Sequence, residues 1–311
     1  MPKRARLVLL MIGLTLVPLA VLAAIFKKQS PPPPPPNVAL ETNVVFGKGG
    51  EQPLHLDITT PKEGKGPFPA LVMVHGGGWI GGDKESLRGF QYHFSQRGIV
   101  CISVQYRFAP KNAFPAQIED VKCAVRWVRA NAAKYNIDPK RIGALGGSAG
   151  AHLVALLGTT SDKKIWEGTG GNPTQSSAIC AMVCMSGPYD LPLFQRTLPQ
   201  SKATKAEQQG LQAALDGLLP GPEASRTGRF QKASPIHYAS KKTVPALLTH
   251  GPNDTLVPME QSEAFEARLT KVGAKVELLR MEGAGHADFG TKPEVAIARI
   301  TAFVEQQLKK P

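Results

Sequence analysis

A serine flanked closely by glycines lies in the segment Gly146–Gly150, which has the sequence GGSAG. This G-x-S-x-G pattern is typical of a strained turn between a strand and a helix, on which a serine hydroxyl is exposed as a nucleophile. Apolar residues at 141–147 predict the strand, and an amphipathic pattern at 151–158 predicts the helix. The segment therefore predicts Ser148 as a nucleophile for acyl transfer, although a small-residue loop that merely joins a strand to a helix would have a similar composition.

A second glycine-rich segment, His75–Trp79, follows an apolar run at 70–74. Consecutive glycines allow backbone N–H groups to face a developing negative charge without obstruction by side chains. We therefore predict that the N–H groups of Gly77 and Gly78, together with that of Ala149 after the nucleophile, form an oxyanion hole.

An acid and a base follow two later apolar runs. Residues 244–249 lead to Asp254, and residues 275–281 lead to His286, so both side chains are expected just beyond the carboxyl ends of strands. The chain order is Ser148, Asp254, His286, which is the order found in the α/β-hydrolase fold. In the expected mechanism His286 removes the serine proton, and Asp254 orients the imidazole and stabilises its protonated form.

The chain resembles esterases of the α/β-hydrolase superfamily, close to the hormone-sensitive-lipase-like and the feruloyl or acetylxylan esterase-like groups. The similarity covers about residues 40–310. Besides the serine turn and the first glycine segment, its marks are Gly81–Lys84, Tyr106–Pro110, Phe114–Ala116, Ser186–Asp190 and His250–Pro258. Two positions depart from the common pattern: Gly147, where many relatives carry an acidic or hydroxyl residue, and Ala151, where a third glycine is common. Both residues are small and compatible with the turn.

Other residues near the strand ends have alternative roles. Position and the resemblance favour Trp79 as a residue of the acyl pocket, the alternative being that it packs the loop. Tyr189 either faces the leaving group or stabilises a turn. Asp190 and Asp288 are rival acids, but Asp288 is only two residues from His286 and is badly placed to reach its ring nitrogen. Asp254, which follows the apolar run at 244–249, fits the position of a triad acid after a strand better than either rival does.

Apolar runs alternate with helical patterns along the rest of the chain, which predicts an α/β fold with a mostly parallel sheet of about eight strands and helices on both faces. Strands are expected near 42–46, 54–59, 70–75, 98–104, 141–147, 179–185, 244–249 and 275–281. Helices are expected near 84–97, 115–135, 149–158, 259–272 and 292–308.

The polar stretch 195–232 interrupts this alternation and contains a helical pattern at 206–219. It is either a small cap over the pocket or an external insertion that does not touch the substrate.

Residues 1–36 have the features of an export or anchoring segment. Three basic residues precede an uncharged run at 7–26, which is followed by two lysines and six prolines. The segment is either a cleaved signal peptide or a retained membrane anchor with a polyproline spacer. Both alternatives place a catalytic domain at 37–311 outside the cytoplasm, secreted, periplasmic or anchored.

Composition excludes several classes of protein. The formal net charge is +13, but five of the basic residues lie in the leader, which leaves +8 for the body. No basic stripe interleaved with aromatic residues is present, so nucleic acid is not an expected partner. The four cysteines lie in apolar runs and are expected to be buried thiols, and their spacing does not predict a metal site. We expect no cofactor.

Together these features predict a serine hydrolase that acts on a carboxylic ester through an acyl-enzyme intermediate. The expected substrate is a short-chain or aromatic acyl ester, on a small molecule or a carbohydrate. An amidase of the arylformamidase or peptidase type is the alternative among enzymes, because the same triad serves both reactions. A binding module that retains the hydrolase fold without catalysis is the alternative outside enzymes.

Overall fold

The computed structural model of the chain describes residues 32–286 and 288–309. The predicted signal or anchor core at 7–26 lies outside the described residues. Within the described ranges, no helix has the length and apolar character needed to cross a bilayer. The prolines at 32–36 lie along the domain, since the Tyr92 hydroxyl donates to the Pro32 carbonyl (3.0 Å) and the Lys62 amine to the Pro36 carbonyl (2.9 Å).

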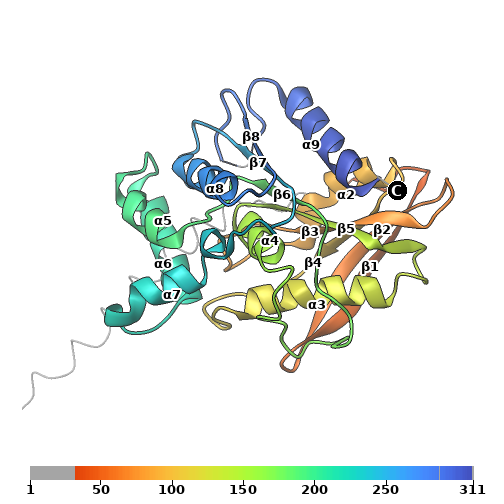
Figure 1. The fold of residues 1–311 in the computed structure, drawn as a ribbon, viewed down its shortest axis with the longest axis horizontal. Helices are drawn as coiled ribbons and strands as arrows, with labels where there is room; N and C mark the ends of the chain where they lie inside the picture. Colours follow the sequence, from red (N-terminus) through yellow and green to blue (C-terminus); the bar gives the residue numbers. More distant parts are fainter. Residues whose placement is uncertain (1–31, 287, 310–311) are drawn as a thin grey trace, which may run out of the picture.

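Eight strands form one sheet in the order β1-β2-β4-β3-β5-β6-β7-β8 (Figure 1). The strands are β1 (Val38–Gly49), β2 (Gln52–Pro61), β3 (Phe68–Val74), β4 (Val100–Val104), β5 (Ile137–Gly147), β6 (Met182–Met185), β7 (Ala246–His250) and β8 (Val276–Arg280). The pairs β1–β2 and β2–β4 are antiparallel, and the other five neighbouring pairs are parallel. The predicted α/β-hydrolase architecture is therefore confirmed.

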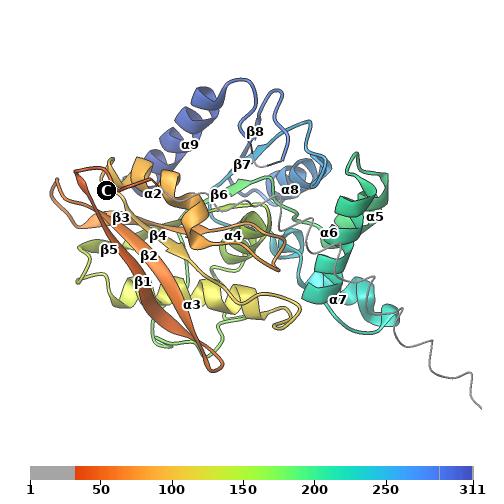
Figure 2. The ribbon, with the colours of Figure 1, turned by 180° about the vertical axis from the view of Figure 1, so that it is seen from behind.

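Helices cover both faces of the sheet, as Figures 1 and 2 show from opposite sides. They are α2 (Arg88–Ser95), α3 (Ala116–Ala130), α4 (Ala149–Thr159), α8 (Glu260–Lys271) and α9 (Pro293–Leu308). Alternation along β3 explains the two layers: Val72 and Val74 belong to the core that includes α3, α4 and α8, whereas Leu71 and Met73 belong to the core that includes α2 and α9. Both faces of the central strands are thus buried, as a parallel sheet requires.

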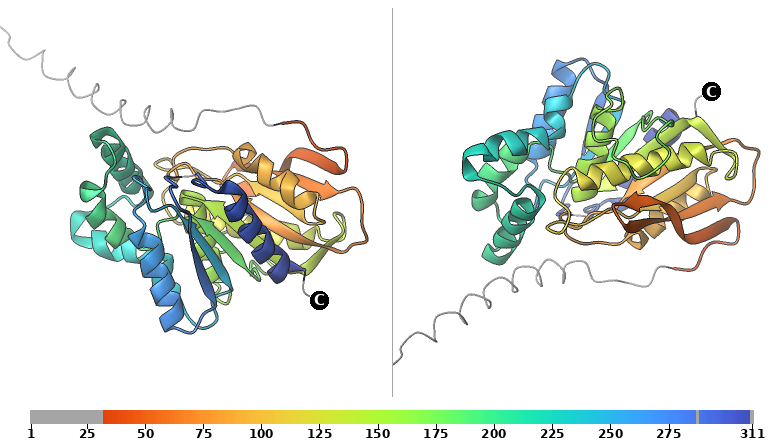
Figure 3. Two further views of the ribbon diagram at one scale, coloured as in Figure 1. Left: turned by 90° about the horizontal axis from the view of Figure 1, so that it is seen from above. Right: turned by 90° about the horizontal axis from the view of Figure 1, so that it is seen from below.

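The stretch 195–232 belongs to a helical group at one end of the molecule (Figure 3). The group comprises α5 (Leu191–Thr197), α6 (Lys205–Leu218) and α7 (Arg226–Lys232), with single-turn segments η2 (Leu198–Gln200), η3 (Glu223–Ser225) and η4 (Pro235–Tyr238). It is tied to the main domain where the Phe114 N–H donates to the Leu218 carbonyl (2.9 Å). Because α5 begins soon after β6 ends, the group starts at the carboxyl edge of the sheet.

A buried ion cluster fixes the chain that follows the first glycine segment. Lys84 begins the single turn η1 (Lys84–Leu87), and its amine lies 3.2 Å from a carboxylate oxygen of Asp57 in β2. The Arg88 guanidinium binds the other oxygen of the same carboxylate, and all three side chains are buried. Breaking such a buried pair is costly because it leaves a charge uncompensated. The cluster therefore holds η1, and the glycine loop before it, against the sheet.

Candidate active site

Ser148 occupies the sharp turn between β5 and α4 that the sequence predicts. Its backbone has φ 53° and ψ −122°, a conformation that is strained for any residue except glycine. The chain passes very close to β3 here, because a Cβ placed on Gly150 would lie 2.0 Å from the carbonyl oxygen of Val74. A Cβ on Gly146 would lie 2.5 Å from the Gly150 carbonyl oxygen. Glycine is therefore required on both sides of the serine.

We expect Gly150→Ala to destabilise the protein. The added methyl group meets rigid backbone, so the free energy of unfolding should fall by about 3 kcal/mol, the upper end of the usual cost of overpacking. Gly89→Ala is the matched control, because a Cβ there has no neighbour within 4 Å and the position is helical. That control should be neutral or slightly stabilising. Urea unfolding of both variants tests the prediction, and equal stability of the two would contradict the described packing.

The structure brings the predicted nucleophile, base and acid together. The His286 Nε2 atom lies 3.0 Å from the Ser148 hydroxyl oxygen, and its Nδ1 atom lies 2.7 Å from Oδ2 of Asp254. These three residues come from the loops after β5, β7 and β8, and they meet because the carboxyl ends of parallel strands share one edge of the sheet. The hydrogen bonds connect a hydroxyl, an imidazole and a carboxylate in the order that general-base catalysis needs.

Asp254 is held as an anion in a buried position. Burial alone raises the pKa of this carboxyl, but hydrogen bonds from His250, His286 and the Val257 backbone together lower its pKa to about 2. The Leu256 and Val257 N–H groups both donate to Oδ1, at 3.0 and 2.9 Å. The carboxylate therefore stays charged throughout the neutral range and can stabilise a protonated imidazole.

His250 is a second imidazole at the same carboxylate, a role that the sequence pattern did not predict. It is fully buried at the end of β7, and its Nε2 atom lies 3.2 Å from Oδ2 of Asp254 and 2.9 Å from the Val257 carbonyl oxygen. Because a carbonyl can only accept, Nε2 carries a proton, and Nδ1 lies 2.7 Å from the Ser262 hydroxyl oxygen. His250 thus donates to the same carboxylate oxygen as the base does, and its position four residues before Asp254 is the only signal that the sequence offers.

We expect His250→Phe to lower kcat by about 10- to 100-fold with little change in KM, which corresponds to the loss of one hydrogen bond to a charged group. The phenyl ring keeps the shape of the side chain but cannot donate to Asp254. His250→Gln should stay within about fivefold of wild type, because its amide N–H can donate from a similar position. Steady-state kinetics below the melting temperature of each variant test this, and an equal loss for Phe and Gln would show a packing role only.

The first glycine loop lies against the nucleophile. A Cβ on Gly76 would lie 3.2 Å from Cβ of Ser148, and Gly77 and Gly78 have φ values of 116° and 58°. Within the described residues, no acceptor binds the N–H groups of these last two glycines or of Ala149. Three backbone donors beside the serine hydroxyl are therefore available to an oxygen of the substrate.

The His75 ring braces this loop. Its Nδ1 donates to the Gly76 carbonyl (2.7 Å), and the ring stacks on Tyr106 with centroids 4.5 Å apart. Burial lowers the pKa of His75 to about 4, so the ring is neutral at pH 7. It supports the position of backbone donors rather than serving as a base.

The structure contradicts the pocket role of Trp79 and Tyr189 and supports the alternative role of Tyr189 in its turn, where the Tyr189 hydroxyl accepts from the Gly187 N–H (3.3 Å). Only 2% of Trp79 is exposed, and its indole N–H donates to Nδ1 of His152 (3.2 Å), so the ring packs against α4. Tyr189 is fully buried and stacks on Phe265, with ring centroids 4.6 Å apart. Neither side chain offers a surface to a substrate. Both are large aromatic residues next to functional loops, and their burial depends on long-range packing that their positions in the sequence do not reveal.

The rival acids serve local structure. Asp190 accepts from the Leu193 N–H (3.0 Å) as the N-cap of α5. Asp288 is exposed, and it accepts from the N–H groups of Gly285 (2.9 Å) and Gly290 (2.8 Å), which shapes the loop that carries His286. These local roles of Asp190 and Asp288 agree with the assignment of Asp254 as the acid of the triad.

The cysteines of the described chain are free thiols. Three are buried as expected, whereas Cys180 is half-buried and precedes β6 rather than lying in it. Within the described ranges, no group of three or more His, Cys, Asp or Glu side chains is arranged to hold a metal ion.

Comparison with known proteins finds one matching family model and several similar proteins. The family model described as BD-FAE matches residues 56–269. Esterase LipC of Mycobacterium tuberculosis (strain ATCC 25618 / H37Rv) is 34% identical over 225 residues, which is 71% of this chain and 53% of that protein. Isoprenylcysteine alpha-carbonyl methylesterase ICME of Arabidopsis thaliana is 30% identical over 251 residues, which is 77% of this chain and 55% of that protein. The chain thus spans about half the length of the curated relatives that it matches.

Two solved structures are similar over nearly their whole length. A truncated carbohydrate esterase from gut microbiota has a TM-score of 0.74 and 28% identity, and the match covers 89% of this chain and 99% of that one. Esterase 2 of Thermogutta terrifontis, phosphonylated by sarin, has a TM-score of 0.71 and 27% identity, and the match covers 90% of this chain and 98% of that one.

Proposed function

Because this chain belongs to the BD-FAE family, we propose that it hydrolyses carboxylic esters with Ser148 as the nucleophile. The observation that carries the proposal is the pair of hydrogen bonds that joins Ser148 to His286 (3.0 Å) and His286 to Asp254 (2.7 Å). The similarity to esterases, one of them modified by an organophosphonate, supports the same reaction.

In the acylation step, the Ser148 oxygen attacks the ester carbonyl carbon while Nε2 of His286 takes the hydroxyl proton. The carbonyl oxygen becomes an anion and accepts hydrogen bonds from the free N–H groups of Gly77, Gly78 and Ala149. Asp254 stabilises the imidazolium that forms. His286 then donates its proton to the leaving alkoxide, the bond between carbonyl carbon and alcohol oxygen breaks, and the acyl group remains on Ser148.

In the deacylation step, water takes the place of the alcohol. His286 removes a proton from the water, the hydroxide attacks the acyl carbon, and the same three donors bind the second oxyanion. His286 returns the proton to the Ser148 oxygen as the acid is released. The net reaction consumes one ester and one water and yields one carboxylic acid and one alcohol.

We propose a short-chain or aromatic acyl ester of a carbohydrate as the substrate class. The similarity to a gut-microbiota carbohydrate esterase over 89% of this chain supports the carbohydrate part. The small α5–α7 group begins at the carboxyl edge of the sheet, where open α/β sheets bind ligands, and so can shape the alcohol side of the site.

A substrate panel tests this proposal. Purified protein is assayed with p-nitrophenyl esters of increasing acyl length, acetylated xylan, methyl ferulate and a formylated aromatic amine. We expect turnover of the short-chain esters and of acetylated xylan or methyl ferulate, with little cleavage of the amide. Cleavage of the formylated amine alone would replace the esterase proposal by an amidase.

A further inference from the structure

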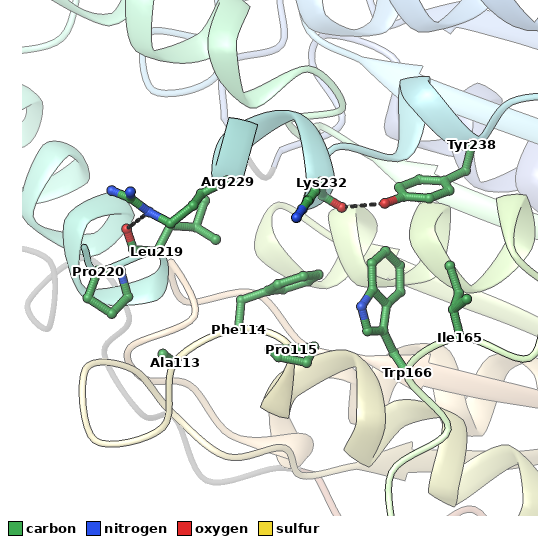
Figure 4. Close-up of a pocket in the computed structure, with 10 residues that line it drawn as sticks. All are labelled: Ala113, Phe114, Pro115, Ile165, Trp166, Leu219, Pro220, Arg229, Lys232 and Tyr238. Atoms are coloured by element: carbon green, nitrogen blue, oxygen red, sulfur yellow. Dashed lines mark hydrogen bonds between the residues drawn. The ribbon is translucent and has the colours of Figure 1, made fainter. Parts of the chain in front are cut away.

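A cleft with a volume of about 530 Å³ lies between the helical group α5–α7 and the main domain (Figure 4). The lining residues are Ala113, Phe114, Pro115, Ile165, Trp166, Leu219, Pro220, Arg229, Lys232 and Tyr238. None of them belongs to the triad or to the glycine loop. The volume falls in the range that suits small molecules, which is about 300–1,000 Å³.

Three half-buried aromatic side chains form the main wall of the cleft. The rings of Phe114 and Trp166 are edge to face at 5.2 Å and 75°, and those of Trp166 and Tyr238 are edge to face at 5.2 Å and 77°. These side chains come from three separate segments, before α3, after α4 and in η4 (Figure 4). Aromatic faces gathered from separate segments give a flat ligand a large apolar surface.

Trp166 is held rigidly at the centre of this wall. Its backbone is in the left-handed region at φ 53°, which is strained for an aromatic residue. The residues on both sides are anchored to α3, because the Lys122 amine donates to the Ile165 carbonyl (2.8 Å) and binds the Glu167 carboxylate (3.0 Å). Arg126 binds the other carboxylate oxygen of Glu167 at 2.7 Å. The ion pairs of the buried Lys122 and Arg126 with the partly exposed Glu167 thus hold the strained segment against α3.

Polar groups at the cleft are left available. Among the described residues, no acceptor binds the indole N–H of Trp166, and no partner binds the exposed amine of Lys232. The Tyr238 hydroxyl donates to the Lys232 carbonyl (2.8 Å), so its oxygen can still accept a hydrogen bond. The cleft therefore offers an N–H donor, an acceptor and a cation beside apolar faces, whereas Arg229 is occupied by carbonyls such as that of Pro222 (2.7 Å).

We propose that this cleft binds the glycan part of the substrate at a distance from the ester, with a carboxylate-bearing sugar placed beside Lys232. Pyranose rings have apolar C–H faces that fit aromatic walls and hydroxyl edges that need donors and acceptors, and both kinds of surface are present. The body of the chain has a net charge of +8, which favours an acidic glycan over a neutral one. The inference rests on the proposed activity toward carbohydrate esters.

Binding is measured first, in the Ser148→Ala background so that no turnover occurs. Isothermal titration calorimetry compares a xylo-oligosaccharide that carries a glucuronic acid branch, the same oligosaccharide without the branch, and ferulate. We expect the acidic oligosaccharide to bind most tightly and Trp166→Ala to weaken its binding about tenfold or more, through lost aromatic contact. Lys232→Gln should reduce the preference for the acidic form.

Tyr135→Ala is the matched control, because Tyr135 is also half-buried but lies beyond the opposite end of α3 from the cleft. It should leave binding unchanged. Absence of saturable oligosaccharide binding up to about 10 mM, a level weaker than ordinary specific affinities, would overturn the proposal. Equal binding in wild type and Trp166→Ala, or binding of ferulate alone, would overturn it as well.

Hydrolysis assays distinguish a failure of the glycan site from a failure of the proposed esterase function. With Ser148 present, Trp166→Ala should lower kcat/KM on acetylated glucuronoxylan about tenfold or more and leave hydrolysis of p-nitrophenyl acetate unchanged. If wild type fails to hydrolyse p-nitrophenyl acetate, the proposed esterase function fails, whatever the binding result. If both substrates lose activity equally in Trp166→Ala, the cleft supports the fold and the glycan site is refuted.

Discussion

Ser148→Ala should lower the rate of ester hydrolysis by at least about 10⁴-fold, because the variant has no hydroxyl to form the acyl-enzyme. The residual rate would come from stabilisation of the oxyanion by backbone N–H groups and from binding of the substrate. The fold should persist, since alanine tolerates the φ of 53° about as well as serine does. Initial rates with p-nitrophenyl acetate and a thermal melt of the same preparation provide the measurement.

Ser186→Ala is the matched control for this substitution. Ser186 follows the neighbouring strand β6, is buried and has a similar φ of 50°, but among the described residues its hydroxyl makes no hydrogen bond to a triad side chain. Its replacement should change the rate by less than about threefold, as expected for a residue outside the reaction. Comparable losses in both variants would show that the turns, and not the Ser148 hydroxyl, limit activity.

Asp254→Asn should lower kcat by about 10⁴-fold, the size of the effect of the same change in a serine protease triad. The carboxamide has nearly the shape of the carboxylate but can donate to Nδ1 of His286, which now lies 2.7 Å from Oδ2. That hydrogen bond would select the tautomer with a proton on Nε2, and such an imidazole cannot accept the Ser148 proton. Steady-state kinetics at neutral pH measure the loss.

Asp288→Asn distinguishes Asp254 from the nearest rival acid. Its carboxylate accepts only from the N–H groups of Gly285 and Gly290 among the described residues, so the change should cost less than about tenfold through a small shift of the loop. A greater loss for Asp288→Asn than for Asp254→Asn would reassign the acid.

The sequence predicted the parts of the molecule that depend on local patterns. Strand alternation, the glycines around Ser148 and the order of the three triad residues depend on short segments, and the structure places all of these as expected. The serine turn was recognisable because a Cβ on Gly146 or Gly150 would clash with backbone. Only small residues are compatible with that geometry, so the glycines make the turn recognisable in the sequence.

Contacts between distant segments could not be predicted in the same way. Trp79 and Tyr189 are near functional loops in the sequence, yet their rings pack against His152 and Phe265. Trp166 belongs to no recognisable pattern in the sequence, and its position depends on α3, where Lys122 anchors the residues on both sides of it. Which face of a loop becomes buried depends on the whole packed structure, and no local periodicity encodes it.

Covalent labelling by a fluorophosphonate probe tests the role of Ser148 directly. A nucleophilic serine attacks the phosphorus and displaces fluoride, so we expect one adduct per chain, on the peptide that contains Ser148. Labelling should abolish ester hydrolysis in parallel and should be absent from Ser148→Ala. An unlabelled Ser148 in protein that still hydrolyses esters, or an adduct on another residue that accounts for the inactivation, would contradict the proposed catalytic centre.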